Sequence, residues 1–325
     1  MKKKILLTSI VIVMILSITC MIFTGCKFKE DQLKDFTPPT MEIGKEMPTW
    51  DNIVPINKDM SAYEMLQVGI ENFYNADYAV IEYNGGVNMK VAGMPVNQVV
   101  QSTKIRQGKG DASGNNANKA LYFADNKSHS SLARLYEKYI IDENRFERKV
   151  AAGKSSISYA GPKKDGKNGR LGKWTVSKWT EPKYYDSLAT LAKENSNNPT
   201  ILWMYDLQES FIIDQIAPIY DEESKTYRFA LKFDPVKSTA EYIKVMQVQL
   251  ESNAGMSVKQ LEFLQLILEF VMWENGTIRS INVNEAYKMK LAGIIDSQVK
   301  LKATQLFSYD ENEAEYKIAD HIAQY

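Results

Sequence analysis

The sequence predicts an α+β protein in which a strongly curved antiparallel β-sheet, half-barrel-like in form, wraps a few α-helices. Apolar and polar residues alternate over long stretches near both ends of the chain, a pattern typical of strands that bury one face. Turn sequences such as Asn275-Gly276 separate these stretches, and helices with capping signals precede them. Because such strands must cover their apolar face, we expect the helices to fill the hollow of the sheet.

The first helix is predicted to begin near Asp59. Ser61 and Glu64 have the spacing of a capping box. Apolar residues then recur at helical spacing, at Ala62, Leu66, Ile70 and Phe73. A single apolar stripe of this kind indicates a helix that packs on its neighbours by one face.

Residues 79–106 are predicted to form a hairpin of two half-buried strands. The side chains expected to share one face of the first strand are Ile81, Tyr83, Val87, Met89 and Val91. Gly85-Gly86 in the middle suggests a bulge or a sharp bend. A turn at Ala92-Gly93 leads to a second strand that contains Val99, Thr103 and Ile105.

The C-terminal third repeats this plan. A strand over 227–233 should stop at Asp234-Pro235, and Ser238 with Glu241 should cap a helix that runs to Gln249. Residues 261–273 are apolar on both periods, and only their later part is interpreted as a strand, because Asn275-Gly276 favours a hairpin turn. The second hairpin, 278–307, turns at Ala292-Gly293. Its apolar face is expected to hold Ile281, Val283, Tyr287, Met289 and Leu291.

The two hairpin regions are similar in sequence. Residues 89–93 read Met-Lys-Val-Ala-Gly, and residues 289–293 read Met-Lys-Leu-Ala-Gly. A duplicated half of the protein would leave such a pair, and so would the shared demands of two amphipathic hairpins. Between them, short strands are expected at 121–123, 139–141, 174–176 and 201–203, a helix at 184–194 and a loop at 161–173.

The N-terminus has the parts of an export signal. Lys2–Lys4 precede an apolar run over 5–23, which ends in Thr24-Gly25-Cys26. These residues resemble a bacterial lipoprotein signal peptide, although Phe23 departs from the usual aliphatic residue. The resemblance implies removal of residues 1–25 and attachment of a diacylglyceryl group to Cys26. The alternative is an uncleaved membrane helix, since the run is long enough to span a bilayer; either way the remainder lies on the extracytoplasmic face of the cell membrane.

The rest of the chain fits an exported, tethered domain. Residues 26–57 are charged and proline-containing, which predicts a flexible tether, and 58–325 are expected to form a single α+β domain. Loss of Lys2–Lys4 takes 40 basic residues to 37 against 40 acidic ones, which argues against nucleic acid as a partner. The mature chain would keep no cysteine except Cys26, so no disulfide is expected.

The sequence offers little for catalysis. It contains only two histidines, His129 in an expected polar loop and His321 near the C-terminus. Neither accompanies a nucleophile motif, and no His or Cys pair has metal-ligand spacing. Asp221-Glu222-Glu223 is interpreted as a solvated turn rather than a calcium loop. We therefore expect no enzyme activity, no metal and no cofactor.

Glu285 breaks the local pattern, because it falls on the apolar side of its strand with Tyr287 and Met289. A buried carboxylate must be paired, hydrogen-bonded or neutral. These three residues could therefore orient a ligand headgroup. The alternatives are a salt bridge to a helix, or a bulge that turns Glu285 outward.

A second candidate is the basic stretch 145–178, which contains Trp174 and Trp179. It could approach anionic lipid or cell-wall polymer, or be a soluble loop.

The order of hairpins and helices after Cys26 loosely resembles the half-barrel domains of lipoprotein carriers and of LppX/LprG-like lipoproteins. That resemblance implies a greasy cavity and transfers no site residue. The sequence thus predicts a lipid-anchored extracytoplasmic protein that binds a lipid or other apolar ligand. The alternative is a structural or interaction protein of the cell envelope, with a solid core and a protein partner.

Overall fold

A computed structural model describes residues 43–109, 120–130, 134–141, 144–151, 154–160, 205–254, 257–310 and 313. All of them belong to the compact unit formed by residues 38–325. The expected signal peptide, Cys26 and most of the expected tether lie outside these residues, as do His321, Trp174 and Trp179. The elements predicted at 161–173, 174–176, 184–194 and 201–203 also lie outside them.

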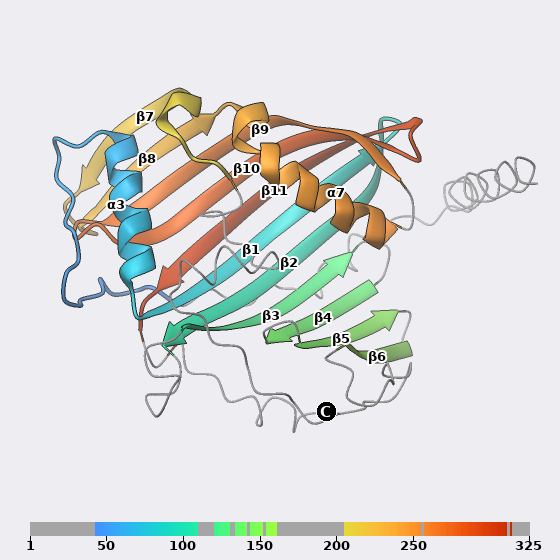
Figure 1. The fold of residues 1–325 in the computed structure, drawn as a ribbon, viewed down its shortest axis with the longest axis horizontal. Coiled ribbons are helices and arrows are strands. Elements are labelled where there is room, and N and C mark those ends of the chain that lie inside the picture. The colour runs from blue at the N-terminus through green and yellow to red at the C-terminus, as the bar shows by residue number, and fades with distance from the viewer. Residues whose placement is uncertain are drawn as a thin grey trace, which may run out of the picture. The chain divides into compact units, whose positions relative to one another are not determined.

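The described strands form one antiparallel sheet of eleven strands, in the order β6-β5-β4-β3-β2-β1-β11-β10-β9-β8-β7 (Figure 1). With the helices, this confirms the α+β class. The strand bounds are β1 Tyr78–Val91, β2 Met94–Lys109, β3 Ala120–Ser130, β4 Arg134–Ile141, β5 Asn144–Ala151, β6 Lys154–Ala160, β7 Ile212–Asp221, β8 Thr226–Phe233, β9 Val258–Trp273, β10 Ile278–Leu291 and β11 Ile295–Ser308.

The predicted strong curvature of the sheet is wrong. The sheet is open, with β6 and β7 at its edges, and it is neither strongly curled nor closed. Bulges and glycine kinks are what bend a sheet, and the bulge expected at Gly85-Gly86 does not exist. Both residues continue the ladders to β11 and β2 without a shift, as Gly85 faces Ala303 on one side and Gln101 on the other. Register shifts do occur elsewhere, between Met89 and Lys90 of β1 and in the β9–β10 and β7–β8 ladders, but they do not curl the sheet into a half-barrel.

Helix α3, Ala62–Asn75, begins at the predicted capping box. The Ser61 amide donates to Glu64 Oε2 at 2.7 Å, and the Glu64 amide donates to Ser61 Oγ at 3.2 Å. Helix α3 contacts β7, β8 and β10, and Figure 1 shows it in front of the sheet, on the same side as α7. The two helices therefore cover a single face of the sheet.

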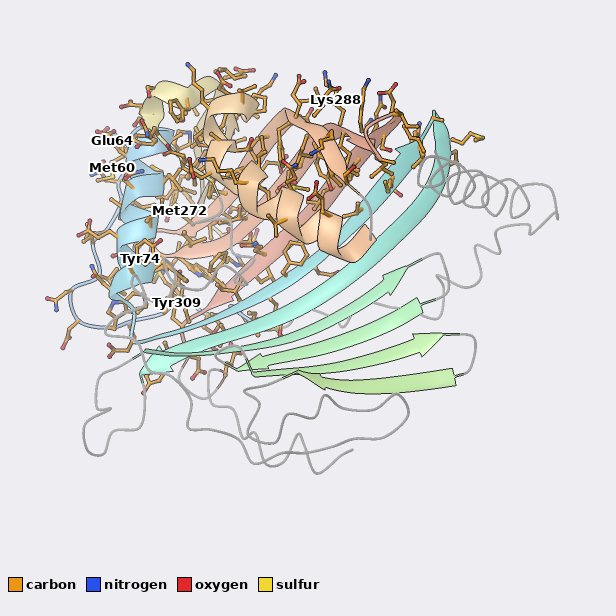
Figure 2. All side chains as sticks on the ribbon, turned by 45° about the vertical axis from the view of Figure 1, so that its right-hand side comes forward. Met60, Glu64, Tyr74, Met272, Lys288 and Tyr309 are labelled. Atoms are coloured by element: carbon orange, nitrogen blue, oxygen red, sulfur yellow. The ribbon has the colours of Figure 1, made fainter. Side chains whose placement is uncertain are left out.

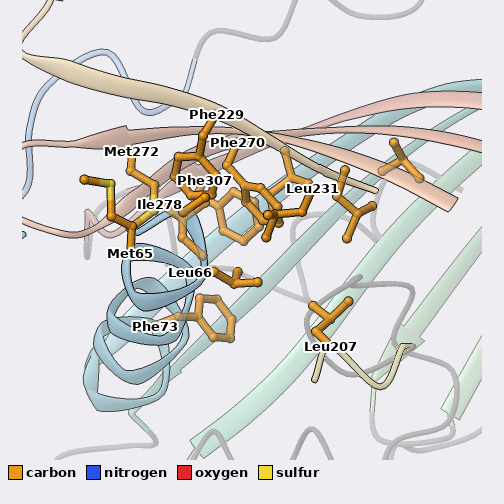
Figure 3. Close-up of a cluster of buried hydrophobic side chains, with 14 of the residues drawn as sticks. Met65, Leu66, Phe73, Leu207, Phe229, Leu231, Phe270, Met272, Ile278 and Phe307 are labelled. Atoms are coloured by element: carbon orange, nitrogen blue, oxygen red, sulfur yellow. The ribbon is translucent and has the colours of Figure 1, made fainter. Parts of the chain in front are cut away.

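The main hydrophobic core lies between α3 and the sheet. Figure 3 shows Met65, Leu66 and Phe73 of α3 facing apolar side chains of β8–β11, and the ring centroids of Phe73 and Phe307 are 5.9 Å apart. Gly69 allows the close approach, since a Cβ there would lie 2.7 Å from Met272 Cε. Described side chains of the helices and of the sheet extend into the space between them (Figure 2).

The C-terminal helical segment differs from its prediction at its start. Asp234-Pro235 ends β8 as predicted, but Asp234 also caps a short helix, α6 (Pro235–Ser238), by accepting from the Val236 and Lys237 amides. Ser238 therefore lies inside α6 and does not cap the next helix. Helix α7, Ala240–Ala254, contacts β9 and continues past the predicted end at Gln249. A short 3₁₀ turn, η2 (Glu209–Phe211), precedes β7.

The hairpins β1–β2 and β10–β11 are built alike. Strand β1 spans Tyr78–Val91 and β10 spans Ile278–Leu291, 200 positions later. Asn88 pairs with Gln98, and at the equivalent positions Lys288 pairs with Gln298. The turn residues Ala92 and Gly93 have φ of 50° and 80°, and Ala292 and Gly293 have 51° and 76°. Positive φ at both central residues is the conformation that tight hairpin turns favour.

Three further sequence expectations can be compared with the structure. Strand β9 spans the whole of Val258–Trp273, beyond the later part that was predicted, and turns into β10 through Gly276 at φ 88°. Residues 121–123 and 139–141 fall within β3 and β4. His129 lies in β3, so its placement in a polar loop is wrong. A strand of alternating small polar residues there lacks the apolar signal on which the prediction relied.

Candidate functional site

Glu285 lies in the middle of β10, on the face that the helices cover. Glu285 is 3 % exposed, and its neighbours on the adjacent strands are Leu266 of β9 and Leu301 of β11. Strand β10 keeps its register with β11 through this point, and the nearby irregularity with β9 leaves Leu264 as the extra residue, 48 % exposed. The bulge therefore turns Leu264 outward, while Glu285 stays inside.

The carboxyl sits where two hydrophobic clusters meet. Val283, two residues before it, belongs to the core under α3, whereas Tyr287 and Met289 belong to a second cluster under α7. This second cluster, called the α7 cluster below, is composed of Met246, Val258, Phe263, Tyr287, Met289 and Val299. Glu285, Tyr287 and Met289 thus line one continuous face, as expected for alternate residues of a strand.

Aromatic rings from four separate segments form a connected series that ends at Tyr287, two residues after Glu285 on β10. Tyr242 of α7 lies 5.8 Å from Phe263 of β9, and Phe263 lies 5.2 Å from Tyr287, measured between ring centroids. Tyr205 meets Tyr242 edge to face at 5.4 Å. The rings therefore form a connected wall from α7 to β10.

Tyr83 of β1 supplies a further phenol, and Gly85 makes room for it. An added Cβ at Gly85 would lie 2.8 Å from the Tyr83 hydroxyl and 2.6 Å from Ala303 Cβ. The Tyr83 side chain therefore lies along its own strand, over Gly85. The glycine that suggested a bend serves instead as space for a neighbouring side chain.

Burial controls the charges in this cluster. It raises the pKa of Glu285 to about 8 and that of Tyr242 to about 12. Burial also raises the pKa of Tyr83 and of Tyr287, and the nearby Glu285 carboxylate and the other phenols add to the increase. At neutral pH the carboxyl is therefore mostly protonated, and it can donate as well as accept a hydrogen bond.

Several polar groups here lack partners within the described residues. No hydrogen bond or ion pair to the Glu285 carboxyl is formed by that part of the chain, and the buried hydroxyls of Tyr205 and Ser297 have no hydrogen-bond partner there. The predicted alternative of a salt bridge between Glu285 and a helix is thus not seen among these residues. Buried polar groups are normally satisfied, so such groups require an explanation.

Helix α7 is held over the cluster at both ends. At its C-terminal half, Gln247 Nε2 donates to the Val258 carbonyl and the Val258 amide donates to Glu251 Oε1, both at 2.9 Å. Before its first turn, the Asp206 amide donates to the Ser238 carbonyl at 2.9 Å. The helix thus closes the cluster through side chains such as Tyr242 and Met246, and few backbone bonds tie it to the sheet.

Asp221, another predicted candidate, belongs to the β7–β8 turn and not to this cluster. Asp221 closes the β7–β8 turn by accepting from the Glu223 and Ser224 amides, and it pairs with Arg228 at 3.8 Å. The described part of the basic stretch lies in β5 and β6. Among the described residues, no three acidic, histidine or cysteine side chains form a group that could hold a metal ion. A solvent-open cleft of about 390 Å³ lies elsewhere. Ser61 and Tyr63, at the start of α3, line it together with residues of η2 and the start of β7.

Sequence reasoning found Glu285, Tyr287 and Met289 but missed Tyr83, Tyr242 and Phe263 as their neighbours. Glu285 carried a signal, since a charge on an apolar face breaks the strand pattern. A tyrosine or phenylalanine on such a face fits the pattern of an ordinary core and therefore gives no signal of a site.

Comparisons with known proteins add no name. No protein-family model matches this chain, and no curated protein matches its sequence. None of the helices in the described part is both long and apolar enough to cross a membrane. The class of the protein is therefore defined by its own fold: an α+β protein with helices on one face of an open antiparallel sheet.

Proposed function

We propose that this chain is an extracytoplasmic bacterial lipoprotein, anchored through lipid on Cys26, that binds a lipid or other apolar ligand beneath α7. The observation that carries the proposal is Glu285, a buried carboxyl without a partner in the described structure, at the meeting point of two apolar clusters. A ligand with an apolar body and one polar group would match these surroundings. Binding sites of this kind are mostly apolar and contain a few placed polar groups.

The energetics favour a binding role over a purely structural one. Burial of a polar group without a hydrogen bond costs roughly 1–3 kcal/mol in proteins. An apolar residue in place of Glu285 would avoid that cost if the position served only the core. A ligand headgroup would instead complete the hydrogen bonding of the carboxyl and of the Tyr205 hydroxyl.

The apolar side chains around the carboxyl suit a ligand that enters by displacing them. Met246 of α7 and Met289 of β10 both belong to the α7 cluster. Methionine is unbranched and adapts its shape to what it packs against. Since α7 is tied to the sheet by few bonds, a shift of this helix would open the space beneath it.

The membrane anchor is proposed from the N-terminal residues. Lys2–Lys4, the apolar run and Thr24-Gly25-Cys26 support export and acylation. Two acyl chains hold a protein at a bilayer stably, because each buried methylene contributes about 0.8 kcal/mol. Residues 26–57 would then separate the domain 58–325 from the membrane surface. Helices on one face of an antiparallel sheet support the looser part of the resemblance to half-barrel carriers.

We propose binding rather than catalysis for the same cluster. A raised pKa keeps Tyr83, Tyr242 and Tyr287 as neutral phenols, which are poor bases and poor nucleophiles. No cofactor or metal is part of the proposal.

The test is to purify the full chain from membranes in a mild detergent and analyse what remains bound. We expect a compound in near-stoichiometric amount by mass spectrometry, reduced in the double variant Tyr242→Ala/Tyr287→Ala. Lys288→Ala is the matched control, because Lys288 is an exposed neighbour on the same strand that pairs with Glu262 at 3.0 Å. If wild type and double variant carry the same compounds in the same amounts, the proposed site is wrong.

One observation favours the second candidate, an interaction protein of the envelope. Edge strand β7 exposes large apolar side chains, with Ile213 at 57 %, Ile216 at 60 % and Ile219 at 64 % exposure. An open sheet edge can pair with an extended segment of another protein. A photocrosslinking amino acid at Ile216 in intact cells would test this, and one reproducible protein adduct would support it.

A further inference from the structure

We infer that the ligand of the α7 cluster carries an organic cation, an ammonium group attached to an apolar body. The inference rests on the proposed function and names the chemical class of its ligand. It follows from neighbouring side chains of one face: the Glu285 carboxyl, the connected rings of Tyr242, Phe263 and Tyr287, and the ring of Tyr83 over Gly85.

The first step is the missing positive charge. Within the described structure, no lysine or arginine forms an ion pair with Glu285, although ion pairs are present on the exposed strand positions nearby, such as Lys288 with Glu262. The neighbours of Glu285 on the adjacent strands are Leu266 and Leu301. A buried carboxyl in such surroundings is completed most strongly by a cation.

The second step is the aromatic wall. The negative face of an aromatic ring attracts a cation, and the attraction grows when water is excluded. Tyr242, Phe263 and Tyr287 are in contact, at 5.8 Å and 5.2 Å between centroids, with tilts of 52° and 38° between their planes. Rings that are tilted to one another present their faces in different directions, as the walls of a cage do. Tyr83 adds a fourth ring, on the side of β1.

The third step excludes the other ligand classes on chemical grounds. An anionic headgroup, such as a carboxylate or phosphate, would gain no charge attraction from the protonated Glu285, would be repelled by its ionised form, and would lie against ring faces that repel it. A neutral headgroup could bond the carboxyl, but it would gain nothing from several aromatic faces. A quaternary or protonated ammonium uses both parts of the cluster.

The experiment compares two ligands of the same shape. Hexanoylcholine carries a trimethylammonium group, and 3,3-dimethylbutyl hexanoate carries an uncharged tert-butyl group in its place. Binding of each to the detergent-purified full chain is followed by calorimetry and by tyrosine fluorescence at pH 8.5. We expect the cation to bind about tenfold more tightly than the neutral ester, as one desolvated cation–π contact alone would produce.

Variants separate the two parts of the cluster. In Glu285→Gln the preference for the cation should fall below about threefold, while binding of the neutral ester stays unchanged. Tyr287→Leu should weaken the preference and Tyr287→Phe should keep it, because the ring and not the hydroxyl attracts the cation. Lys288→Ala should behave as wild type.

The outcomes distinguish this inference from the proposed function. Equal binding of both esters would show that the site does not select a cation, and the proposed apolar binding site would remain. If neither ester binds, the compound retained from membranes decides: an amine-containing one supports the inference and an uncharged or acidic one overturns it. If neither ester binds and nothing is retained, both the inference and the proposed function are wrong.

Discussion

Tyr83 and Glu285 interact across a strand that lies between their own two strands. Tyr83 is on β1 and Glu285 on β10, and β11 lies between the two strands. Burial raises the pKa of the Tyr83 phenol, and the Glu285 carboxylate adds to that increase across the intervening strand. The side chain of Tyr83 spans the gap because it extends along β1 over Gly85, toward Val87. Both Val87 of β1 and Glu285 of β10 pair with the same residue of β11, Leu301. A residue without a side chain on β1 thus helps to assemble a site centred on β10.

Substitution of Gly85 should test this arrangement. In Gly85→Ala the new Cβ would lie 2.6 Å from Ala303 Cβ and 2.8 Å from the Tyr83 hydroxyl. We expect the free energy of unfolding to fall by about 1–3 kcal/mol, the usual cost of overpacking. Urea unfolding measures it, with Asn88→Ala at an exposed site of the same strand as control. Adding Tyr83→Phe should recover part of the loss; if the double variant is simply additive, Tyr83 does not lie over Gly85.

The buried carboxyl predicts a stability that depends on pH. The pKa of Glu285 is about 8 in the folded protein against an ordinary value of 4.5, so the folded state keeps a proton that the unfolded state releases between these values. The stabilising effect is complete below pH 4.5 and is lost as the pH rises toward 8. The loss is on the order of 5 kcal/mol at about 1.4 kcal/mol per pKa unit.

Glu285→Gln should remove this slope. The difference in unfolding free energy between wild type and variant, measured in urea at pH 5.0 to 8.5, should therefore shift steadily in favour of the variant. The neutral amide has no proton to lose, and its shape matches the protonated carboxyl. A variant that is less stable than wild type by several kcal/mol at pH 8 would show that the carboxylate already has a partner within the protein.

Glu285 and Gly85 also show how much of the site could be predicted from the sequence. The charge of Glu285 was visible as a break in the alternation of β10, and its place on the covered face followed from the period of a strand. Gly85-Gly86 was equally visible but misinterpreted, because a glycine leaves space either for a bend of its own backbone or for another side chain. Only the position of Ala303 and Tyr83 decides between these roles.

Local sequence signals predicted helix starts and hairpin turns well, but they could not predict which distant residues pair across the sheet. The capping box at Ser61 and the turns at Ala92-Gly93 and Ala292-Gly293 depend on residues a few positions apart, which the sequence displays. The contact of Tyr242 with Phe263 joins a helix to a strand, and no sequence pattern encodes that distance. The curvature of the sheet depends on every strand pairing at once, and the expectation of a strongly curled half-barrel failed for that reason.

The cap of α3 predicts a modest and local stability effect. Ser61→Ala removes the hydroxyl that accepts from the Glu64 amide at 3.2 Å, and it leaves an amide of the first turn without its partner. We expect a loss of about 1 kcal/mol in the free energy of unfolding. Gln67→Ala, on the exposed side of the same helix, is the control and should change little. Equal effects in the two variants would mean that the cap does not contribute.

The anchor is tested by the two cysteines of the N-terminal segment. Cys26→Ser should abolish incorporation of labelled palmitate and lead to accumulation of an unprocessed precursor, since the acylated cysteine is what the resemblance to lipoprotein signals requires. Cys20→Ser lies inside the apolar run and should be processed and labelled as wild type. A Cys26→Ser protein of unchanged size and unchanged membrane association would instead indicate an intact N-terminal helix.

The pH dependence of ligand binding joins the carboxyl to the proposed cation. The groups that face Glu285 from the packed elements are the phenols of Tyr83, Tyr242 and Tyr287, whose raised pKa values keep them neutral below pH 9. Among these four groups, Glu285, with its pKa of about 8, is the one that changes charge between pH 6 and 9. A permanent cation binds the ionised carboxylate more tightly than the protonated one, so the affinity for hexanoylcholine should rise by about three- to tenfold in all between pH 6 and 9, with its midpoint near pH 8. The neutral ester, and either ester with Glu285→Gln, should bind equally at every pH. Calorimetry from pH 6 to 9 measures both, and a cation affinity that stays constant over this range would show that Glu285 does not bind it.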